Sequence, residues 1–224
     1  MRFWKESDRA RMVRKHLRGR GLTCPRLLEA FSQVPREEFV PPSLREWAYA
    51  DRPLGIGSGQ TISQPYIVAL TVEKLHIRPD DKVLEVGTGS GYAAAILSRL
   101  AAQVITVERL PELAHSARQR LQALGYDNVT VICADGTQGY PAAAPYNAIA
   151  VAAGGPQVPP SLKEQLAVKG RLVIPVGEED DQTLVRVTRV DAETFHQEQL
   201  CKVRFVPLVG QEGWQPAAQE HGSL

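Results

Sequence analysis

A glycine-rich turn follows a short apolar run near the middle of the sequence. Residues 82–91 read KVLEVGTGSG, in which an acid, Glu85, precedes three alternating glycines. Glycine places no side chain on Cα, so such a turn exposes backbone N–H groups to a polar ligand at the start of the next helix. A dinucleotide turn of the form Gly-x-Gly-x-x-Gly needs glycine at position 92, which is Tyr here. The pattern indicates either a nucleoside without a diphosphate or a turn that only closes the connection.

Two further acids follow the next two apolar runs. Glu108 lies 17 residues after Gly91, where a carboxylate can accept hydrogen bonds from both ribose hydroxyls. Asp135 is followed by Gly136, so the acid can accept the exocyclic amine of adenine while the glycine leaves space for the ring. Each also has a local explanation, a strand-end acid for Glu108 and an Asx turn for Asp135. Together, at the carboxyl ends of consecutive parallel strands, the acids and the turn favour a nucleoside site.

These residues must be positioned by alternating strands and helices. Short apolar runs, largely β-branched, occur from residue 83 onward, and helical spacing separates most of them. This alternation predicts right-handed crossovers and a Rossmann-like, doubly wound, mostly parallel α/β sheet. The strands are predicted at 83–86, 104–107, 129–133, 148–152 and 172–176, and the helices at 92–100, 111–124 and 162–168.

The two ends of the chain depart from this rhythm. Only residues 177–181 separate the fifth run from the next, 183–190, which is too short for a crossover helix and predicts antiparallel C-terminal edge strands, with another at 200–206. At the N-terminus we expect a helical extension, whose second helix starts near Pro25 with Thr23 as a possible cap. We expect one domain, made of an N-terminal helical and lid segment (1–78), a cofactor-binding core (79–210) and a flexible tail (211–224).

The composition of the chain limits the classes of protein to which it can belong. A net charge of +1, 43% hydrophobic residues and the lack of a long apolar run are typical of a globular protein without a membrane partner. The three cysteines are isolated and the histidines form no ligand pair, so we expect no metal. The N-terminus becomes charged before an apolar core could form, so we expect no secretory signal and a cytoplasmic location. The first twenty residues hold eight Lys or Arg against two acids, which favours a solvated helix face over a nucleic-acid-binding arm.

The turn and the two acids together resemble the class I methyltransferases, which use S-adenosylmethionine and release S-adenosylhomocysteine. Residues 54–65, LGIGSGQTISQP, closely resemble the characteristic motif of the protein-L-isoaspartate O-methyltransferase family. The resemblance extends from about residue 12 to 214 and includes the segments 34–40, 83–92, 135–139, 170–177 and 205–208. It implies methylation of isoaspartyl-containing proteins and peptides by a monomer.

The resemblance also implies which residues form the site. Ser63 corresponds to the active serine of the family. The cofactor-binding set comprises Gln60, Thr61, Ile62, Ser63, Glu85, Gly87, Thr88, Gly89, Glu108, Arg109, Asp135 and Gly136. Ser63 has a local alternative as the N-cap of a helix at 66–75. Glycines 55, 57 and 59 suggest that residues 60–63 act as a mobile lid.

The chemistry agrees with the absence of a conspicuous catalytic histidine. The α-carboxyl freed in an isoaspartyl residue has a pKa near ~3.5, so the nucleophile is ionised at neutral pH and needs no general base. Gly55 and the Gly154–Gly155 pair depart from the usual residues of the family, and we expect a looser substrate wall from them. The alternatives are an S-adenosylmethionine-dependent methyltransferase acting on RNA or a small molecule, and a noncatalytic nucleoside-binding module.

Overall fold

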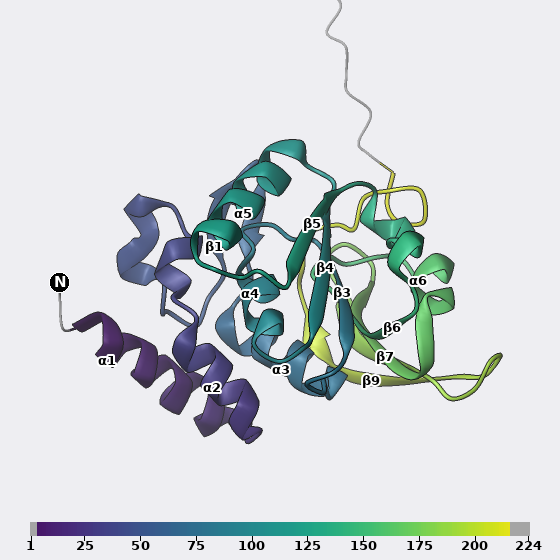
Figure 1. Ribbon diagram of the computed structural model, residues 1–224, viewed down its shortest axis with the longest axis horizontal. Coiled ribbons are helices and arrows are strands. Elements are labelled where there is room, and N and C mark those ends of the chain that lie inside the picture. The colour runs from purple at the N-terminus through teal and green to yellow at the C-terminus, as the bar shows by residue number, and fades with distance from the viewer. Residues whose placement is uncertain (1–3, 216–224) are drawn as a thin grey trace, which may run out of the picture.

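A seven-stranded sheet forms the centre of the molecule in the computed structural model, which describes residues 4–215 (Figure 1). The strand order is β5-β4-β3-β6-β7-β8-β9. Strands β3 to β7 pair in parallel, whereas β8 runs antiparallel to both of its neighbours, as predicted for the C-terminal edge. The strands are β3 (Lys82–Val86), β4 (Gln103–Glu108), β5 (Val129–Cys133), β6 (Tyr146–Val151), β7 (Leu166–Gly177), β8 (Gln182–Arg189) and β9 (Phe195–Val203).

Both faces of the sheet are covered, as expected for strands that are apolar along their whole length. Alternate residues of β3 face opposite sides, with Val83 in the same core cluster as helices α3 (Pro65–Leu75) and α4 (Tyr92–Ser98). Leu84 packs into a second cluster with Leu162 of helix α6 (Pro160–Glu164). Helix α5 (Pro111–Ala123) contacts β4 and β5. The Rossmann-like, doubly wound architecture predicted from the sequence is confirmed.

The N-terminal extension is helical, as predicted, and lies beside α3 at one end of the sheet (Figure 1). Helix α1 (Trp4–Arg11) continues into a π-helical turn (Met12–Leu17) and a 3₁₀ turn (Arg18–Arg20), and α2 (Pro25–Gln33) follows. Two 3₁₀ turns (Arg36–Phe39 and Pro42–Trp47) then lead to a small hairpin of β1 (Leu54–Gly57) and β2 (Gln60–Ile62). Short 3₁₀ turns also occur at Gly136–Gln138 and Pro141–Ala143.

Four local predictions were wrong. Thr23 does not cap α2, because Cys24 holds the N-cap position without a side-chain hydrogen bond. The helix predicted at 162–168 ends at Glu164, since Leu166 already pairs with Tyr146 in the sheet; a short apolar run fits either structure. The last strand runs from Phe195 to Val203 instead of 200–206.

The fourth correction concerns the boundary of the tail. Residue 211 does not begin a free segment, because the Gln211 N–H donates to Asp135 Oδ2 at 2.8 Å and the Trp214 indole N–H donates to the Gly154 carbonyl at 3.0 Å. The core therefore extends at least to Trp214, and residues 216–224 of the predicted tail lie outside the described residues. Among residues 4–215, no helix is long and apolar enough to cross a membrane.

Candidate active site

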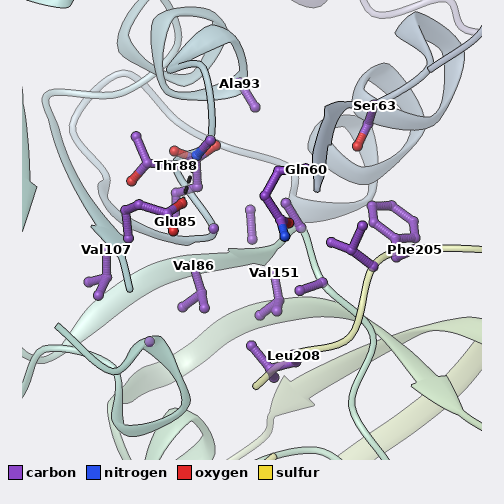
Figure 2. Close-up of a pocket in the computed structure, with 18 of the residues that line it drawn as sticks. Gln60, Ser63, Glu85, Val86, Thr88, Ala93, Val107, Val151, Phe205 and Leu208 are labelled. Carbon is purple, nitrogen blue, oxygen red and sulfur yellow. Dashed lines mark hydrogen bonds between the residues drawn. The ribbon is translucent and has the colours of Figure 1, made fainter. Parts of the chain in front are cut away.

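A cavity opens at the carboxyl ends of the central strands, where the chain order reverses. Strand β3 has β4 on one side and β6 on the other, which is the switch point where doubly wound sheets bind ligands. The ends of all three strands line the cavity, together with β2 and the segment 205–209 (Figure 2). Of the site residues predicted from the sequence, the cavity contains Gln60, Thr61, Ile62, Ser63, Glu85, Gly87, Thr88, Gly89, Glu108, Arg109 and Gly136. Asp135 does not line it.

The glycine turn requires glycine for its conformation. Gly87, Gly89 and Gly91 have φ values of 93°, 51° and 90°, all in the left-handed region that other residues rarely adopt. The space around the turn is also restricted, since a Cβ on Gly91 would lie 3.2 Å from Leu121. The turn therefore lines the cavity, but the N–H groups of all three glycines donate to acceptors of the protein itself, so the predicted exposure of these groups to a ligand is not observed.

The buried carboxylate of Glu108 is held by this turn. One oxygen accepts from the Gly89 N–H at 2.9 Å and the other from the Leu110 N–H at 3.0 Å. The side chain is only 7% exposed, so its orientation toward the cavity is fixed. Because each carboxylate oxygen accepts more than one hydrogen bond, both retain capacity for a ligand hydroxyl.

Glu85 is the most unusual group in the cavity. It is 1% exposed, and its Oε2 accepts a 2.5 Å hydrogen bond from Thr106, whose hydroxyl also contacts Thr88 at 2.6 Å. Its Oε1 is buried and has no partner among the described residues. Desolvation raises the pKa of Glu85 to about 8, a trend that the Thr106 hydrogen bond opposes and the nearby Glu108 reinforces. A buried carboxyl with one unpaired oxygen fits a cationic ligand group.

The floor of the cavity is apolar around Gly136. A Cβ on Gly136 would lie 2.6 Å from Val86 Cγ1, so only glycine fits this position without a shift of the Val86 side chain. Val107 and Val151 complete the apolar surface (Figure 2). Gly136 therefore leaves space beside apolar side chains, and a contact between this position and a planar ring stays a prediction.

Asp135 is engaged with the protein itself. Its Oδ1 accepts from the backbone N–H and the hydroxyl of Thr137, at 2.9 and 2.7 Å, and its Oδ2 accepts from the Gln211 N–H. These hydrogen bonds hold its pKa below the usual value although partial burial acts in the opposite direction. The Asx-type turn raised as an alternative is therefore present, and a contact between Asp135 and a nucleobase stays a prediction.

Ser63 lies between the β1–β2 hairpin and helix α3. In Figure 2 its side chain points toward the cavity, on the same side as Phe205. The helix begins with Pro65 after Gln64, without a side-chain cap at that position, and Asp51 accepts the Tyr66 N–H at 3.1 Å. Ser63 is therefore not the helix cap. Among residues 4–215, its hydroxyl has no hydrogen-bond partner, which leaves it free for a ligand.

The segment 205–209 completes the wall and was not assigned to the site from the sequence. It lies beside the residues that come after β6, because the Gly154 N–H donates to the Val206 carbonyl and the Leu208 N–H donates to the Gly154 carbonyl, both at 2.8 Å. The buried Gln182 side chain donates to the Phe205 carbonyl and accepts from its N–H. The only sequence signal was the family resemblance of residues 205–208.

The expectation of a looser wall at Gly154 was wrong. A Cβ on Gly154 would lie 2.5 Å from the Gln182 side chain, so the missing methyl group is replaced by a buried amide. At Gly155 a Cβ would lie 2.9 Å from the Gln157 carbonyl oxygen. The wall is therefore closely packed. Gly55, in contrast, has no atom within 4 Å of an added Cβ and a φ outside the left-handed region.

The sheet order, the glycine turn and the cavity above it define a Rossmann-like methyltransferase. A family model described as protein-L-isoaspartate(D-aspartate) O-methyltransferase matches residues 7–213. The chain belongs to this family.

Relatives and solved structures agree with this assignment. The protein-L-isoaspartate O-methyltransferase of Protochlamydia amoebophila is 57% identical over 205 residues, covering 91% of this chain and 98% of the relative. That of Methanoregula boonei is 54% identical over 211 residues, covering 94% and 97%. A Plasmodium falciparum structure described as a protein-L-isoaspartate O-methyltransferase in complex with S-adenosyl-L-homocysteine has a TM-score of 0.77 at 26% identity, covering 90% and 96%. These names support the isoaspartate hypothesis over methylation of RNA or a small molecule.

Proposed function

We propose that this protein transfers a methyl group from S-adenosylmethionine to the free α-carboxylate of isoaspartyl residues in damaged proteins and peptides. The observation that carries the proposal is the cavity at the carboxyl end of β3, which combines a nucleoside-binding glycine turn with the unpaired hydroxyl of Ser63. The family relationship over residues 7–213 supports the choice of acceptor.

Three groups on the cavity wall fit three parts of the cofactor. The unpaired Oε1 of Glu85 would accept the ammonium group, and the oriented carboxylate of Glu108 would accept the ribose hydroxyls. The apolar surface at Gly136 would hold the adenine ring. When bound, S-adenosylmethionine supplies a methyl group activated by a sulfonium.

The chain contributes positioning. The acceptor carboxylate is ionised at neutral pH, so no side chain must remove a proton from it. The Ser63 hydroxyl would donate to this carboxylate and hold one oxygen in line with the methyl group. The β1–β2 hairpin and the segment 205–209 enclose the reacting groups and would limit the access of water. A carboxylate oxygen then forms the new O–C bond while the C–S bond breaks, and its electron pair remains on sulfur.

The product is a methyl ester at the isoaspartyl α-carboxyl. Methanolate leaves more readily than oxide, so the neighbouring backbone nitrogen can displace it and close a succinimide. Hydrolysis then opens the succinimide ring, and part of the product is normal aspartate. The reaction therefore initiates repair.

The test compares two peptides that differ only in the linkage at one residue. The protein is incubated with methyl-labelled S-adenosylmethionine and either the isoaspartyl or the aspartyl form. We expect label only in the isoaspartyl peptide, released as methanol in mild base as an ester requires. Equal labelling of both peptides, or a product stable to base, contradicts the proposal.

Ser63→Ala tests the role of the hydroxyl. Loss of one donor that acts in the transition state costs about 2.7–4 kcal/mol, so we expect kcat to fall by about 10²–10³ while S-adenosylhomocysteine still binds. An unchanged kcat would remove Ser63 from the mechanism without affecting the assignment of the acceptor.

We further propose that the protein acts as a monomer in the cytoplasm, without nucleic acid. The cavity is lined by segments of this one chain, so it needs no second subunit. The three cysteines are free, which suits a reducing compartment. Arg9 and Arg20 of the basic segment pair with Glu37 and Asp51, which lowers the charge available to a phosphate backbone.

A further inference from the structure

Arg36 is fully buried behind the site. Its side chain is 0% exposed, and its Nε donates to the Ala48 carbonyl at 2.7 Å. Its Nη2 donates to the carbonyl of Ser63 at 2.9 Å. The guanidinium carbon lies 4.7 Å from the ring centroid of Tyr92, the first residue of the helix after the glycine turn. One buried arginine thus contacts both the serine segment and the helix that follows the cofactor turn.

No carboxylate forms a salt bridge with this guanidinium among the described residues. Its Nη1 is buried without a partner, and desolvation lowers the pKa of Arg36, opposed by the hydroxyl of Tyr92 and by the more distant Asp51. A buried charge whose hydrogen bonds go only to carbonyls is unfavourable for folding, and an apolar side chain of similar volume would fill this space at a lower cost. Its contribution to stability alone therefore gives no reason for an arginine here.

A second anchor holds the residues that directly follow Ser63. Asp51 accepts from the Tyr66 N–H in the first turn of α3 and from Gln64 Nε2 at 2.9 Å, and it pairs with Arg20 at 2.9 Å. The main chain from the carbonyl of Ser63 to the first turn of α3 is therefore fixed to the N-terminal segment. The predicted mobility of residues 60–63 does not extend to the carbonyl of Ser63 in this arrangement, whereas the glycines of the hairpin turn lie beyond the anchors.

We infer that Arg36 is a positioning residue for methyl transfer: by holding the carbonyl of Ser63, it sets the direction in which the Ser63 hydroxyl meets the acceptor carboxylate. The inference rests on the proposed role of Ser63. Arg36 itself is not among the residues that line the cavity, so it acts through the serine and does not contact either substrate.

The test is a double-mutant cycle of Arg36→Lys and Ser63→Ala, with kcat and KM for an isoaspartyl peptide and Kd for S-adenosylhomocysteine measured in each protein. Lysine keeps the charge but cannot bind two carbonyls in the fixed geometry of a guanidinium. We expect Arg36→Lys to lower kcat by about 10- to 100-fold, as for a small misplacement of a reacting group, with Kd within about twofold. Added to Ser63→Ala, it should lower kcat by no more than about twofold further, because residues acting as a unit are not additive.

Arg26→Lys is the matched control. Arg26 also donates to two backbone carbonyls, those of Ile77 and Leu100, but neither carbonyl belongs to the segment that carries Ser63. We expect it to lower the melting temperature without changing kcat. Arg36→Met provides a second variant that fills the space without the charge, and it should lose kcat at least as strongly as Arg36→Lys.

Several outcomes would contradict the positioning role of Arg36. Effects of Arg36→Lys and Ser63→Ala that multiply would show that Arg36 acts independently of the serine and would overturn the inference. An unchanged kcat in Arg36→Lys, or loss of S-adenosylhomocysteine binding in both Arg36 variants, would also overturn it, the latter by making Arg36 a residue of general stability. If kcat is unchanged in Ser63→Ala, the result contradicts the role of Ser63. If the unmodified protein fails to label the isoaspartyl peptide, the result contradicts the proposed function.

Discussion

Glu85 makes the stability of the free protein depend on pH in an unusual direction. Burial raises its pKa from 4.5 to about 8, so between these values the folded state holds a proton that the unfolded state has lost. Unfolding then releases this proton, and the free energy of unfolding falls as pH rises. The stabilisation is complete below pH 4.5 and is lost as pH passes through about 8.

The magnitude follows from the shift. One pKa unit corresponds to about 1.4 kcal/mol, so the contribution of Glu85 to the free energy of unfolding should fall by about 4 kcal/mol between pH ~5 and ~8. His76 acts in the opposite direction, because burial and nearby arginines lower its pKa and its contribution grows as pH rises through its ordinary value of 6.5. The lowered pKa values of Asp135 and Asp191 affect stability only in more acidic solution.

Glu85→Gln isolates this contribution because every other group is common to both proteins. The amide keeps an oxygen for the hydrogen bond from Thr106 and cannot ionise. We propose to measure urea unfolding without cofactor from pH ~5 to ~8. The free energy of unfolding of the variant should rise by about 4 kcal/mol relative to that of the wild type across this range. Parallel curves for the two proteins would refute the argument, since they would mean that Glu85 titrates at the same pH in the folded and unfolded states.

Three further results are expected at the cofactor site. Binding of S-adenosylhomocysteine should release about one proton near pH 7 in the wild type and none in Glu85→Gln, measured by calorimetry in buffers of different ionisation enthalpy. Gly136→Ala places a Cβ 2.6 Å from Val86 and should cost about 1–3 kcal/mol in S-adenosylhomocysteine affinity, whereas Gly55→Ala, with no atom within 4 Å, should bind normally in the same titration. Glu108→Gln should weaken this binding by about 1.5–3 kcal/mol, the contribution of a hydrogen bond to a charged group, and unchanged affinity would exclude a ribose contact.

The parallel core and the glycine turn could be predicted because their causes are local. Strands such as 83–86 are largely apolar and buried on both faces, which is typical of a strand covered by helices on both sides. The glycines at 87, 89 and 91 are required by the backbone conformation of the turn itself, whatever the rest of the chain does. A resemblance then placed Ser63 near the cofactor cavity without any long-range contact having to be derived.

The parts that could not be predicted depend on contacts between distant segments. Asp135 has the same local sequence whether it faces a ligand or caps its own turn, and the deciding hydrogen bond comes from Gln211, 76 residues later. Similarly, Gly154 was expected to loosen the wall, but the space is filled by Gln182 from another strand. In both cases the competing interpretations differ only in a partner that local pattern cannot identify.

The basic N-terminal segment shows why this matters for function. The solvated helix face predicted from its charge is present, since Arg11, Arg14 and Lys15 are exposed. In addition, Arg9 donates to Glu37, 28 residues away, and Arg20 pairs with Asp51, 31 residues away. Asp51 also accepts from the first turn of α3, directly after Ser63, so part of this charge stabilises the segment that carries the serine. The variant Arg20→Ala should therefore lower the rate of methyl transfer, because it removes a partner from the Asp51 carboxylate that fixes α3. Loss of a surface charge by itself would have no such effect. The N-terminal extension is on this argument a structural part of the active site.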